Sequence, residues 1–332
     1  MKIKVTDLNK VVVNILSSKF YSEQEAEKIS EVLLYAELAG KNTQGVLKLM
    51  GTEPAQNIKP EYTAKILKET KASALIDGGG SAGPLSAQFG TDTAIRIAKE
   101  NGFSIVGLKN TRSSIGAIGF YARKIARQNF IGIVMAGCPR SVALVGGLEQ
   151  VYGTDPMAFS FPTNEHPIVF DMSTAAITWY GLVRAKTLGQ KLSDDVAIDK
   201  DGNITTDPTA AMSGAILPAG NSYKGSGLAM VVELLAGALN GAGFVFDKGD
   251  KPDDWGTTFI VISPDLLIGT EEFKKNSSEL VRKVKSKKTK DGKVPHIPGY
   301  DTEFKIMDIL RTGKVEIEDT ILEQIRNIGK LD

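Results

Sequence analysis

The chain is poor in the two residue types that most often bind metals or form redox centres. Its 332 residues include one cysteine, Cys138, and two histidines, His166 and His296. A single cysteine excludes an internal disulfide bond and a cysteine-based metal cluster. We therefore expect no metal site, and we expect a mechanism that does not depend on several histidines.

Net charge is also scarce, which bears on the partners of the protein. Forty Lys and Arg residues face 39 Asp and Glu residues, so the formal charge is +1 and no overall field attracts nucleic acid. Nine basic residues do gather between Lys274 and Lys293, but aromatic residues do not alternate with them as in nucleic-acid-binding surfaces. We interpret this segment as a solvated amphipathic helix and its exit loop.

Long apolar runs are missing as well. The longest, residues 228–240, is too short to span a bilayer and contains Glu233. The N-terminus lacks the apolar run of a signal peptide. We therefore expect a cytoplasmic protein that binds neither nucleic acid nor a membrane, and its length favours about two hydrophobic cores.

Hydrophobic periodicity predicts a helical N-terminal third and a strand-rich middle. Thr6 and Ser22 are candidate N-caps, Ser22 with the spacing of a capping box, and Gly40 lies where a helix would end in a left-handed residue. Strands are predicted at 73–77, 104–109, 130–136, 157–161, 168–172 and 258–263, and helices at 85–100, 175–186 and 227–240. The last helix is apolar nearly all round, so we expect it to be buried at the centre of its domain.

One glycine-rich segment has the spacing of a dinucleotide-binding loop. Gly78, Gly80 and Gly83 match G-x-G-x-x-G between a predicted strand and a predicted helix. A Rossmann unit also needs an acidic residue at the end of the next strand, where this chain has Lys109 and Asn110. We therefore favour an ordinary turn.

Two other segments could bind an anion or simply begin a helix. Residues 223–227, Tyr-Lys-Gly-Ser-Gly, stand directly before the apolar helix, whose free N–H groups and dipole suit a phosphate. Lys224 adds a charge there, although a tight loop with an exposed lysine explains the pattern equally well. The second segment, Asp171-Met172-Ser173-Thr174, ends a strand, and Ser173 or Thr174 is the expected N-cap of the following helix.

These segments, taken in order with three others, resemble the malate/L-lactate dehydrogenase-like family, which includes ureidoglycolate dehydrogenase, 2,3-diketo-L-gulonate reductase, sulfolactate dehydrogenase and Δ1-piperideine-2-carboxylate reductase. The matching segments are Gly153-Thr154-Asp155-Pro156, Phe170–Thr174, Ile216-Leu217-Pro218, Lys224–Leu228 and Glu233–Gly237. The resemblance runs nearly from end to end, so it is more specific than any single glycine motif.

The resemblance implies an α+β fold in two parts. Residues 73–264 would form a non-Rossmann nicotinamide-binding domain with a largely antiparallel sheet. Residues 1–72 and 265–332 would form a helical substrate and dimerisation domain built from both chain ends. It also implies a homodimer whose active site lies between the domains and draws on the partner subunit.

The resemblance further implies a nicotinamide cofactor, NAD or NADP. Family members hold it with a segment matched here by Asp171, Met172 and Ser173, and with a Lys-Gly pair matched here by Lys224 and Gly225. Arg311, in the last matching segment, and Lys224 are candidates for a 2′-phosphate, but each suits a pyrophosphate or a solvated surface as well.

The catalytic positions depart from the family pattern. The family usually has Ser-His-Gly-Val followed by Arg, with the His as proton donor and the Arg on the substrate carboxylate; this chain has Thr43, Gln44 and Lys48 at those three positions. A second family histidine is replaced by Ser114. Glutamine at position 44 forms hydrogen bonds but does not transfer a proton near neutral pH. Lysine at position 48 keeps the positive charge of arginine but cannot bind a carboxylate through two parallel hydrogen bonds.

Two hypotheses follow from these departures. The first is an NAD(P)-dependent oxidoreductase acting on a small 2-oxo, 2-hydroxy or 2-imino carboxylate, with Lys48 on the carboxylate, Gln44 and Thr43 orienting the reacting group, and Ser114 nearby. The proton donor is open between Lys48, Tyr223, Tyr121 and an ordered water, and an imine substrate needs none because it arrives protonated. The second hypothesis is a nicotinamide-binding protein of the same fold that has lost catalysis.

Overall fold

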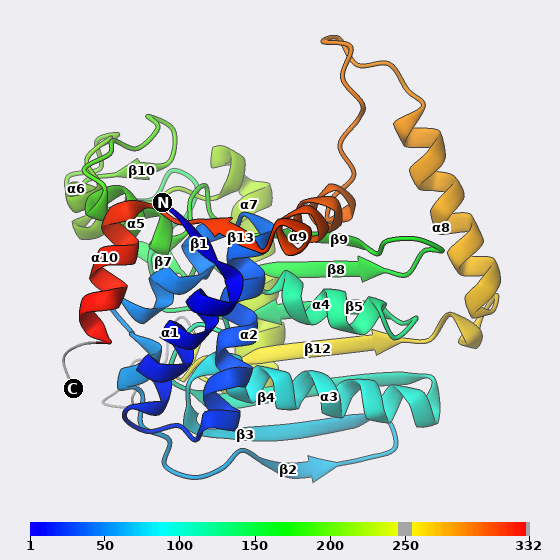
Figure 1. The fold of residues 1–332 in the computed structure, drawn as a ribbon. Coiled ribbons are helices and arrows are strands. Elements are labelled where there is room, and N and C mark those ends of the chain that lie inside the picture. The colour runs from blue at the N-terminus through cyan, green and yellow to red at the C-terminus, as the bar shows by residue number, and fades with distance from the viewer. Residues whose placement is uncertain (245–253, 330–332) are drawn as a thin grey trace.

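The computed structural model describes residues 1–244 and 254–329, and a seven-stranded sheet lies at its centre (Figure 1). In spatial order the strands are β2 (Lys65–Glu69), β3 (Ser73–Ser81), β4 (Phe103–Thr111), β12 (Thr257–Ile262), β5 (Ile131–Ala136), β8 (Met157–Phe161) and β9 (Ile168–Met172). Among these described strands, β3 and β4 form the one parallel pair. The sheet is therefore largely antiparallel, as predicted, whereas a Rossmann sheet is parallel.

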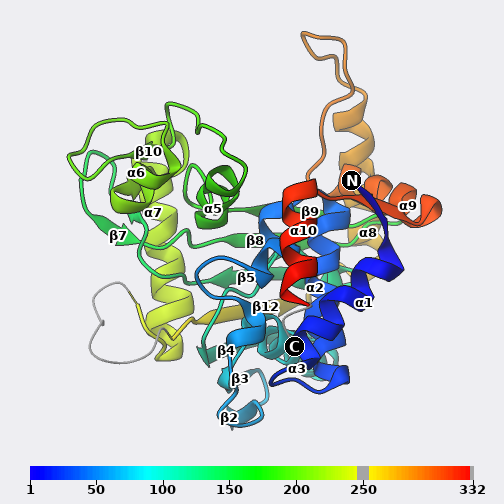
Figure 2. The same cartoon turned by 60° about the vertical axis from the view of Figure 1, so that its left-hand side comes forward.

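Helices from both chain ends pack beside this sheet (Figures 1 and 2). The chain ends supply α1 (Val5–Ser17), α2 (Glu23–Ala39), α9 (Tyr300–Thr312) and α10 (Asp319–Ile328). Two further helices, α3 (Gly83–Asn101) and α4 (Gly119–Ala126), connect strands of the sheet and pack with them. A short antiparallel pair, β1 (Lys2–Lys4) with β13 (Lys314–Glu316), joins the two ends. One continuous cluster of buried side chains connects these helices with the sheet, while α8 (Thr270–Lys285) stands away from the body.

A smaller unit with a separate buried cluster lies beside the main sheet (Figure 2). Its four strands, in spatial order, are β10 (Ala197–Ile198), β11 (Ala215–Ile216), β6 (Val142–Ala143) and β7 (Gln150–Tyr152). The helices α5 (Trp179–Thr187), α6 (Pro208–Ser213) and α7 (Tyr223–Val232) accompany them. Within the described residues, no helix is both long enough and apolar enough to cross a membrane.

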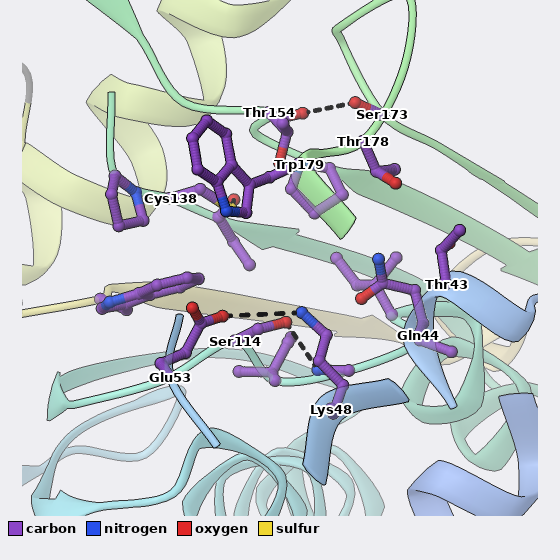
Figure 3. Close-up of a pocket in the computed structure, with 18 of the residues that line it drawn as sticks. Thr43, Gln44, Lys48, Glu53, Ser114, Cys138, Thr154, Ser173, Thr178 and Trp179 are labelled. Carbon is purple, nitrogen blue, oxygen red and sulfur yellow. Dashed lines mark hydrogen bonds and ion pairs between the residues drawn. The ribbon is translucent and has the colours of Figure 1, made fainter. Parts of the chain in front are cut away.

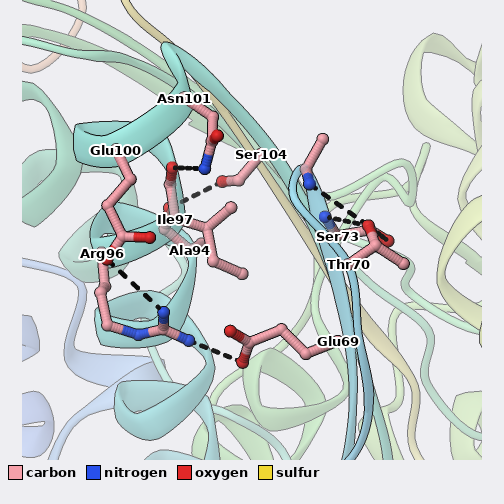
Figure 4. A network of polar contacts seen from close by, with 10 residues as sticks. Glu69, Thr70, Ser73, Ala94, Arg96, Ile97, Glu100, Asn101 and Ser104 are labelled. Carbon is pink, nitrogen blue, oxygen red and sulfur yellow. Dashed lines mark hydrogen bonds and ion pairs between the residues drawn. The ribbon is translucent and has the colours of Figure 1, made fainter.

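Residues 65–69, which the family resemblance placed in the helical domain, form the edge strand β2. Arg96 of α3 holds this edge by pairing with Glu69 at 2.6 Å, and the Thr70 hydroxyl accepts the backbone N–H of Ser73 at 3.1 Å to close the β2–β3 turn (Figure 4). Every residue of β2 is exposed, and its charged side chains are typical of a protected sheet edge. The strand has no buried alternation, which is why the sequence pattern did not reveal it.

The glycine-rich segment Gly78–Gly80 is not an ordinary turn, because it lies within β3, which continues to Ser81. Gly79 and Gly80 take φ values of 67° and 66°, and a Cβ atom on Gly79 would lie 2.0 Å from the carbonyl oxygen of Tyr62. Glycine is thus required by backbone conformation and by close approach of another chain segment.

Helix starts were predicted with mixed success. Ser22 caps α2 in a complete capping box with Glu25, and Gly40 ends that helix with φ 76°, both as predicted. Thr6 is not a cap, because α1 already begins at Val5. Ser173 and Thr174 are not caps either, since α5 begins at Trp179 and the Thr178 hydroxyl accepts the N–H of Gly181.

The apolar helix predicted at 227–240 begins earlier and is not buried all round. It starts at Tyr223 as α7 and continues as a π turn, Glu233–Gly237, and a 3₁₀ turn, Ala238–Asn240. One face packs on the protein, but four large apolar side chains are between 43% and 58% exposed: Met230, Val231, Leu234 and Leu239. The prediction of burial was wrong because no residue of the described part of the chain covers the second face.

Candidate active site

A cavity of about 460 Å³ opens between the end of α2, the loop after β4, the loop after β5 and the end of β9. It brings together residues that lie far apart in the sequence (Figure 3). The predicted site residues that line it are Thr43, Gln44, Lys48, Ser114, Asp171, Met172 and Ser173.

Two consecutive 3₁₀ turns carry the first three of these side chains. After Gly40 ends α2, the chain forms η1 (Asn42–Gln44) and η2 (Val46–Leu49), joined at Gly45. These tight turns place Thr43 and Gln44 at one edge of the cavity and Lys48 on its floor, as seen in Figure 3. The Gln44 amide points into the space, where it can donate or accept a hydrogen bond.

Lys48 is an unusual lysine because its side chain is only 8% exposed. Its Nζ lies 3.4 Å from the centre of the Tyr180 ring and 3.7 Å from Oε1 of Glu53. Burial lowers the pKa of Lys48 to about 8, and the nearby Glu53 carboxylate limits that fall. A lysine with this pKa is charged at neutral pH and able to release its proton in a reaction.

Ser114 has a local structural contact at the position of the second family histidine. Its hydroxyl oxygen accepts the backbone N–H of Gly116 at 3.1 Å, which shapes the loop beside Lys48 (Figure 3). Gly116 takes φ 79° there. The hydroxyl can still donate its proton to a ligand in the cavity.

The Asp171–Ser173 segment is held by contacts on both sides. Asp171 forms an ion pair with Lys41, and its second oxygen accepts the N–H of Gly119 at 3.1 Å. The Ser173 hydroxyl donates to the Thr154 carbonyl oxygen at 2.8 Å (Figure 3). The Asp171 carboxylate is therefore engaged within the chain, and it fixes the wall rather than standing free.

A family model for malate/L-lactate dehydrogenase matches residues 3–326. The chain belongs to this family. It is 33% identical over 332 residues to the malate/(S)-sulfolactate dehydrogenase of Methanothermus fervidus, covering 96% of this chain and 94% of that protein. It is 31% identical over 339 residues to the ureidoglycolate dehydrogenase (NAD(+)) of Escherichia coli, covering 98% and 95%. The solved sulfolactate dehydrogenase of Methanocaldococcus jannaschii superposes with a TM-score of 0.82 at 32% identity, covering 99% and 97%.

Membership relates the chain to oxidoreductases and agrees with its mixed α/β architecture. Three residues that the resemblance assigned to the cofactor nevertheless do not line the cavity of this chain. Lys224 is exposed in the first turn of α7, and Arg311 is 79% exposed and paired with Asp308 at 2.6 Å. Gly225 is buried, and a Cβ atom there would lie 2.6 Å from the Ala219 carbonyl oxygen.

Two proposed proton donors are also outside the cavity. Tyr121 is fully buried with its hydroxyl on the Ile115 carbonyl oxygen, and burial raises its pKa well above the usual value. Tyr223 is 73% exposed at the start of α7 and does not line the cavity. Of the three side chains proposed as proton donors, Lys48 is the one that lines the cavity.

Sequence reasoning missed several residues that line the cavity. Glu53 and both tryptophans of the chain, Trp179 and Trp255, belong to it, together with Arg112 and Arg140. The indole N–H of Trp255 is buried without a hydrogen-bond partner among the described residues. The rarity of tryptophan was an available signal, but Glu53 is revealed only by its distance to Lys48.

Proposed function

We propose that this chain is an NAD(P)-dependent oxidoreductase that adds hydride to, or removes it from, C2 of a small 2-oxo, 2-hydroxy or 2-imino carboxylate. Family membership supports the reaction class. The observation that carries the proposal is a buried lysine of lowered pKa in a cavity shared with Gln44 and Thr43. Perturbed ionisable groups in a cavity are characteristic of catalytic sites.

The lining has the chemistry that a nicotinamide cofactor requires. Met172 and the two indoles offer apolar surfaces to a flat ring, and the unpartnered Trp255 N–H can donate to a carboxamide or ribose oxygen. Lys41 and Arg112 could form ion pairs with phosphate oxygens, although each already pairs with an acidic residue of the chain. When bound, NAD or NADP would supply or accept the hydride. Nothing in this lining favours one of the two cofactors.

We assign the proton transfer to Lys48. When hydride adds to a carbonyl carbon, the oxygen gains the electron pair of the C=O bond and must take a proton. The Lys48 ammonium would give this proton and become a neutral amine, with Gln44 hydrogen-bonded to the same oxygen. Arg140, which has no ion-pair partner among the described residues, is then the cation left for the substrate carboxylate.

The role first predicted for Lys48, holding the carboxylate, is the competing assignment, and it pairs naturally with an imine substrate. An iminium ion arrives protonated and leaves as an amine, so its reduction needs no acid at the hydride step. The absence of both family histidines favours an imine substrate, whereas the lowered pKa of Lys48 favours a carbonyl substrate.

The exposed apolar face of α7 and the following turns supports a homodimer. Contiguous exposed apolar side chains of this size usually mark an interaction surface. A second copy is the occupant that the family resemblance suggests. Lys224 and Gly225 lie in the first turn of the same helix. If this helix packs against a second copy, these two residues would reach the cavity of the partner subunit. Charge introduced by Met230→Glu and Leu234→Glu is expected to give a species near 35.6 kDa by sedimentation.

The first experiment titrates the protein with NADH and NADPH and follows tryptophan emission, since both tryptophans line the cavity. Pyruvate, oxaloacetate and pyruvate with methylamine are then added. Turnover with keto acids supports Lys48 as proton donor. Turnover only when methylamine is present supports an imine substrate, with Lys48 on the carboxylate. Binding without turnover favours a non-catalytic nicotinamide-binding protein, and absence of binding refutes the proposal.

A further inference from the structure

A buried carboxylate lies directly behind the turn that carries Thr43 and Gln44. Glu37, near the C-terminal end of α2, is only 3% exposed. Its Oε1 accepts the backbone N–H of Val46 at 2.7 Å, and its Oε2 accepts the side-chain amide of Asn42 at 2.6 Å. One carboxylate thus contacts the residues on both sides of the Thr43–Gln44–Gly45 segment.

The backbone approaches this carboxylate very closely. A Cβ atom on Gly45 would lie 1.9 Å from Oε1 of Glu37 and 2.5 Å from its carboxyl carbon. Glycine at position 45 is therefore required for the turn to lie against the carboxylate. The contact leaves little room for the turn to shift while Glu37 accepts both hydrogen bonds.

Charged groups near this carboxylate have opposing effects. Burial raises the pKa of Glu37 to about 7, while the bonds from Val46 and Asn42 hold it down. Glu318, ahead of α10, raises it and Arg184 of α5 lowers it, and these two groups pair with each other. Three lysines also lie near this end of α2: Lys41 beside η1, Lys48 on η2 and Lys305 of α9, which meets Gly40. Farther along the elements packed on α2, Arg123 of α4 pairs with Glu303 of α9.

We propose that Glu37 is a positioning residue for this site, whose ionised carboxylate holds Thr43 and Gln44 against the cavity and whose protonation releases them. Protonation turns one acceptor oxygen into a donor that faces another donor, so the Asn42 amide must turn or one bond is lost. The effect on the turn is independent of what the cavity binds; its effect on catalysis rests on the proposed function.

The first test does not depend on activity. In protein labelled with ¹⁵N-valine, the Val46 amide should shift with an inflection near pH 7, because its acceptor titrates. Glu37→Gln should abolish the inflection, since a glutamine side chain does not titrate in this range. A flat wild-type Val46 signal, or the same inflection in Glu37→Gln, would overturn the proposal.

A second variant guards against misfolding of Glu37→Gln. Asn42→Ala removes one hydrogen bond that holds the pKa of Glu37 down, so the Val46 inflection should move to higher pH. Movement to lower pH, or no movement, would contradict the assignment of the inflection to Glu37.

The catalytic consequence is read from the pH profile of kcat. In the wild type, kcat should fall about tenfold per pH unit well below pH 7. Glu37→Gln presents a donor to Asn42 as protonated Glu37 does, so it should lose this acid limb and have a lowered kcat even at pH 7.5. Glu25→Gln is the matched control, because Glu25 accepts a backbone N–H on the exposed end of the same helix. Retention of the acid limb in Glu37→Gln refutes the positioning role, whereas absence of turnover in every protein refutes the proposed function and leaves the Val46 titration standing.

Discussion

Two lysines that the resemblance placed at one site occupy very different surroundings. Lys48 is buried on the cavity floor over the Tyr180 ring, and its pKa is lowered to about 8. Lys224 is exposed in the first turn of α7, outside the cavity. A buried ammonium can serve as an acid near neutral pH, whereas a solvated one offers mainly its charge. The burial of a matched residue, and not its identity alone, decides which chemistry it can perform.

The largest expected effect separates the two roles of Lys48. Lys48→Arg keeps the charge and restores the residue usual in the family, but a guanidinium does not give up its proton. If Lys48 is the proton donor, kcat for a keto acid should fall by roughly 10²- to 10⁴-fold, as is usual for loss of a general acid. Steady-state kinetics measures this, with Lys48→Met as the uncharged companion.

The two variants also show which alternative is correct if the donor role fails. If Lys48 only holds the carboxylate, Lys48→Arg should remain active and Lys48→Met should have a greatly raised KM. Equal, small effects of both substitutions would remove Lys48 from the mechanism.

The second prediction is an alkaline limb set by the same lysine. The Lys48 ammonium is present below its pKa of about 8 and is lost above it. Reduction of a keto acid should therefore slow about tenfold per pH unit above pH 8, while oxidation of the 2-hydroxy acid, which needs the neutral amine, should rise with pH up to about pH 8 and then level off. Initial rates in both directions test this, and parallel profiles would contradict it.

The sequence predicted local structure well where the pattern was local. The strands 157–161 and 168–172 have the predicted bounds, and the Ser22 capping box is confirmed, because each depends on neighbouring residues. Apolar composition alone could not show that α7 has an exposed face, since a core and an interface have the same pattern.

The candidate site could be predicted only in part, because several of its residues are defined by tertiary contacts. The resemblance named Lys48 but not Glu53 or Glu37, which act through contacts made by the folded chain. Thr178 as the cap of α5 was missed because Ser173 and Thr174 offer the same chemistry a few residues earlier, and their hydroxyls bond the Thr154 carbonyl oxygen instead. Choosing between such equivalents requires tertiary structure.

The third prediction concerns the partner that tunes Lys48. Glu53 raises the pKa of Lys48, so Glu53→Gln should move the alkaline limb down by up to about one pH unit. Glu61→Gln is a matched control, because Glu61 pairs with Arg112, a lining cation that does not titrate in this range. A limb that stays in place in Glu53→Gln, or moves equally in the control, would show that Glu53 does not set it.

The smallest expected effect belongs to the exposed lysine. An exposed cation that helps to hold a phosphate through solvent contributes about 0.2–1 kcal/mol, so Lys224→Met should raise the KM for NADH or NADPH by at most about fivefold. It should leave both limbs of the pH profile unchanged. Lys200→Met, an exposed lysine in the 199–203 turn, controls for loss of surface charge. A loss above a hundredfold would mean that Lys224 becomes buried against the cofactor in the assembled protein, and the contrast with Lys48 would then hold only for the isolated chain.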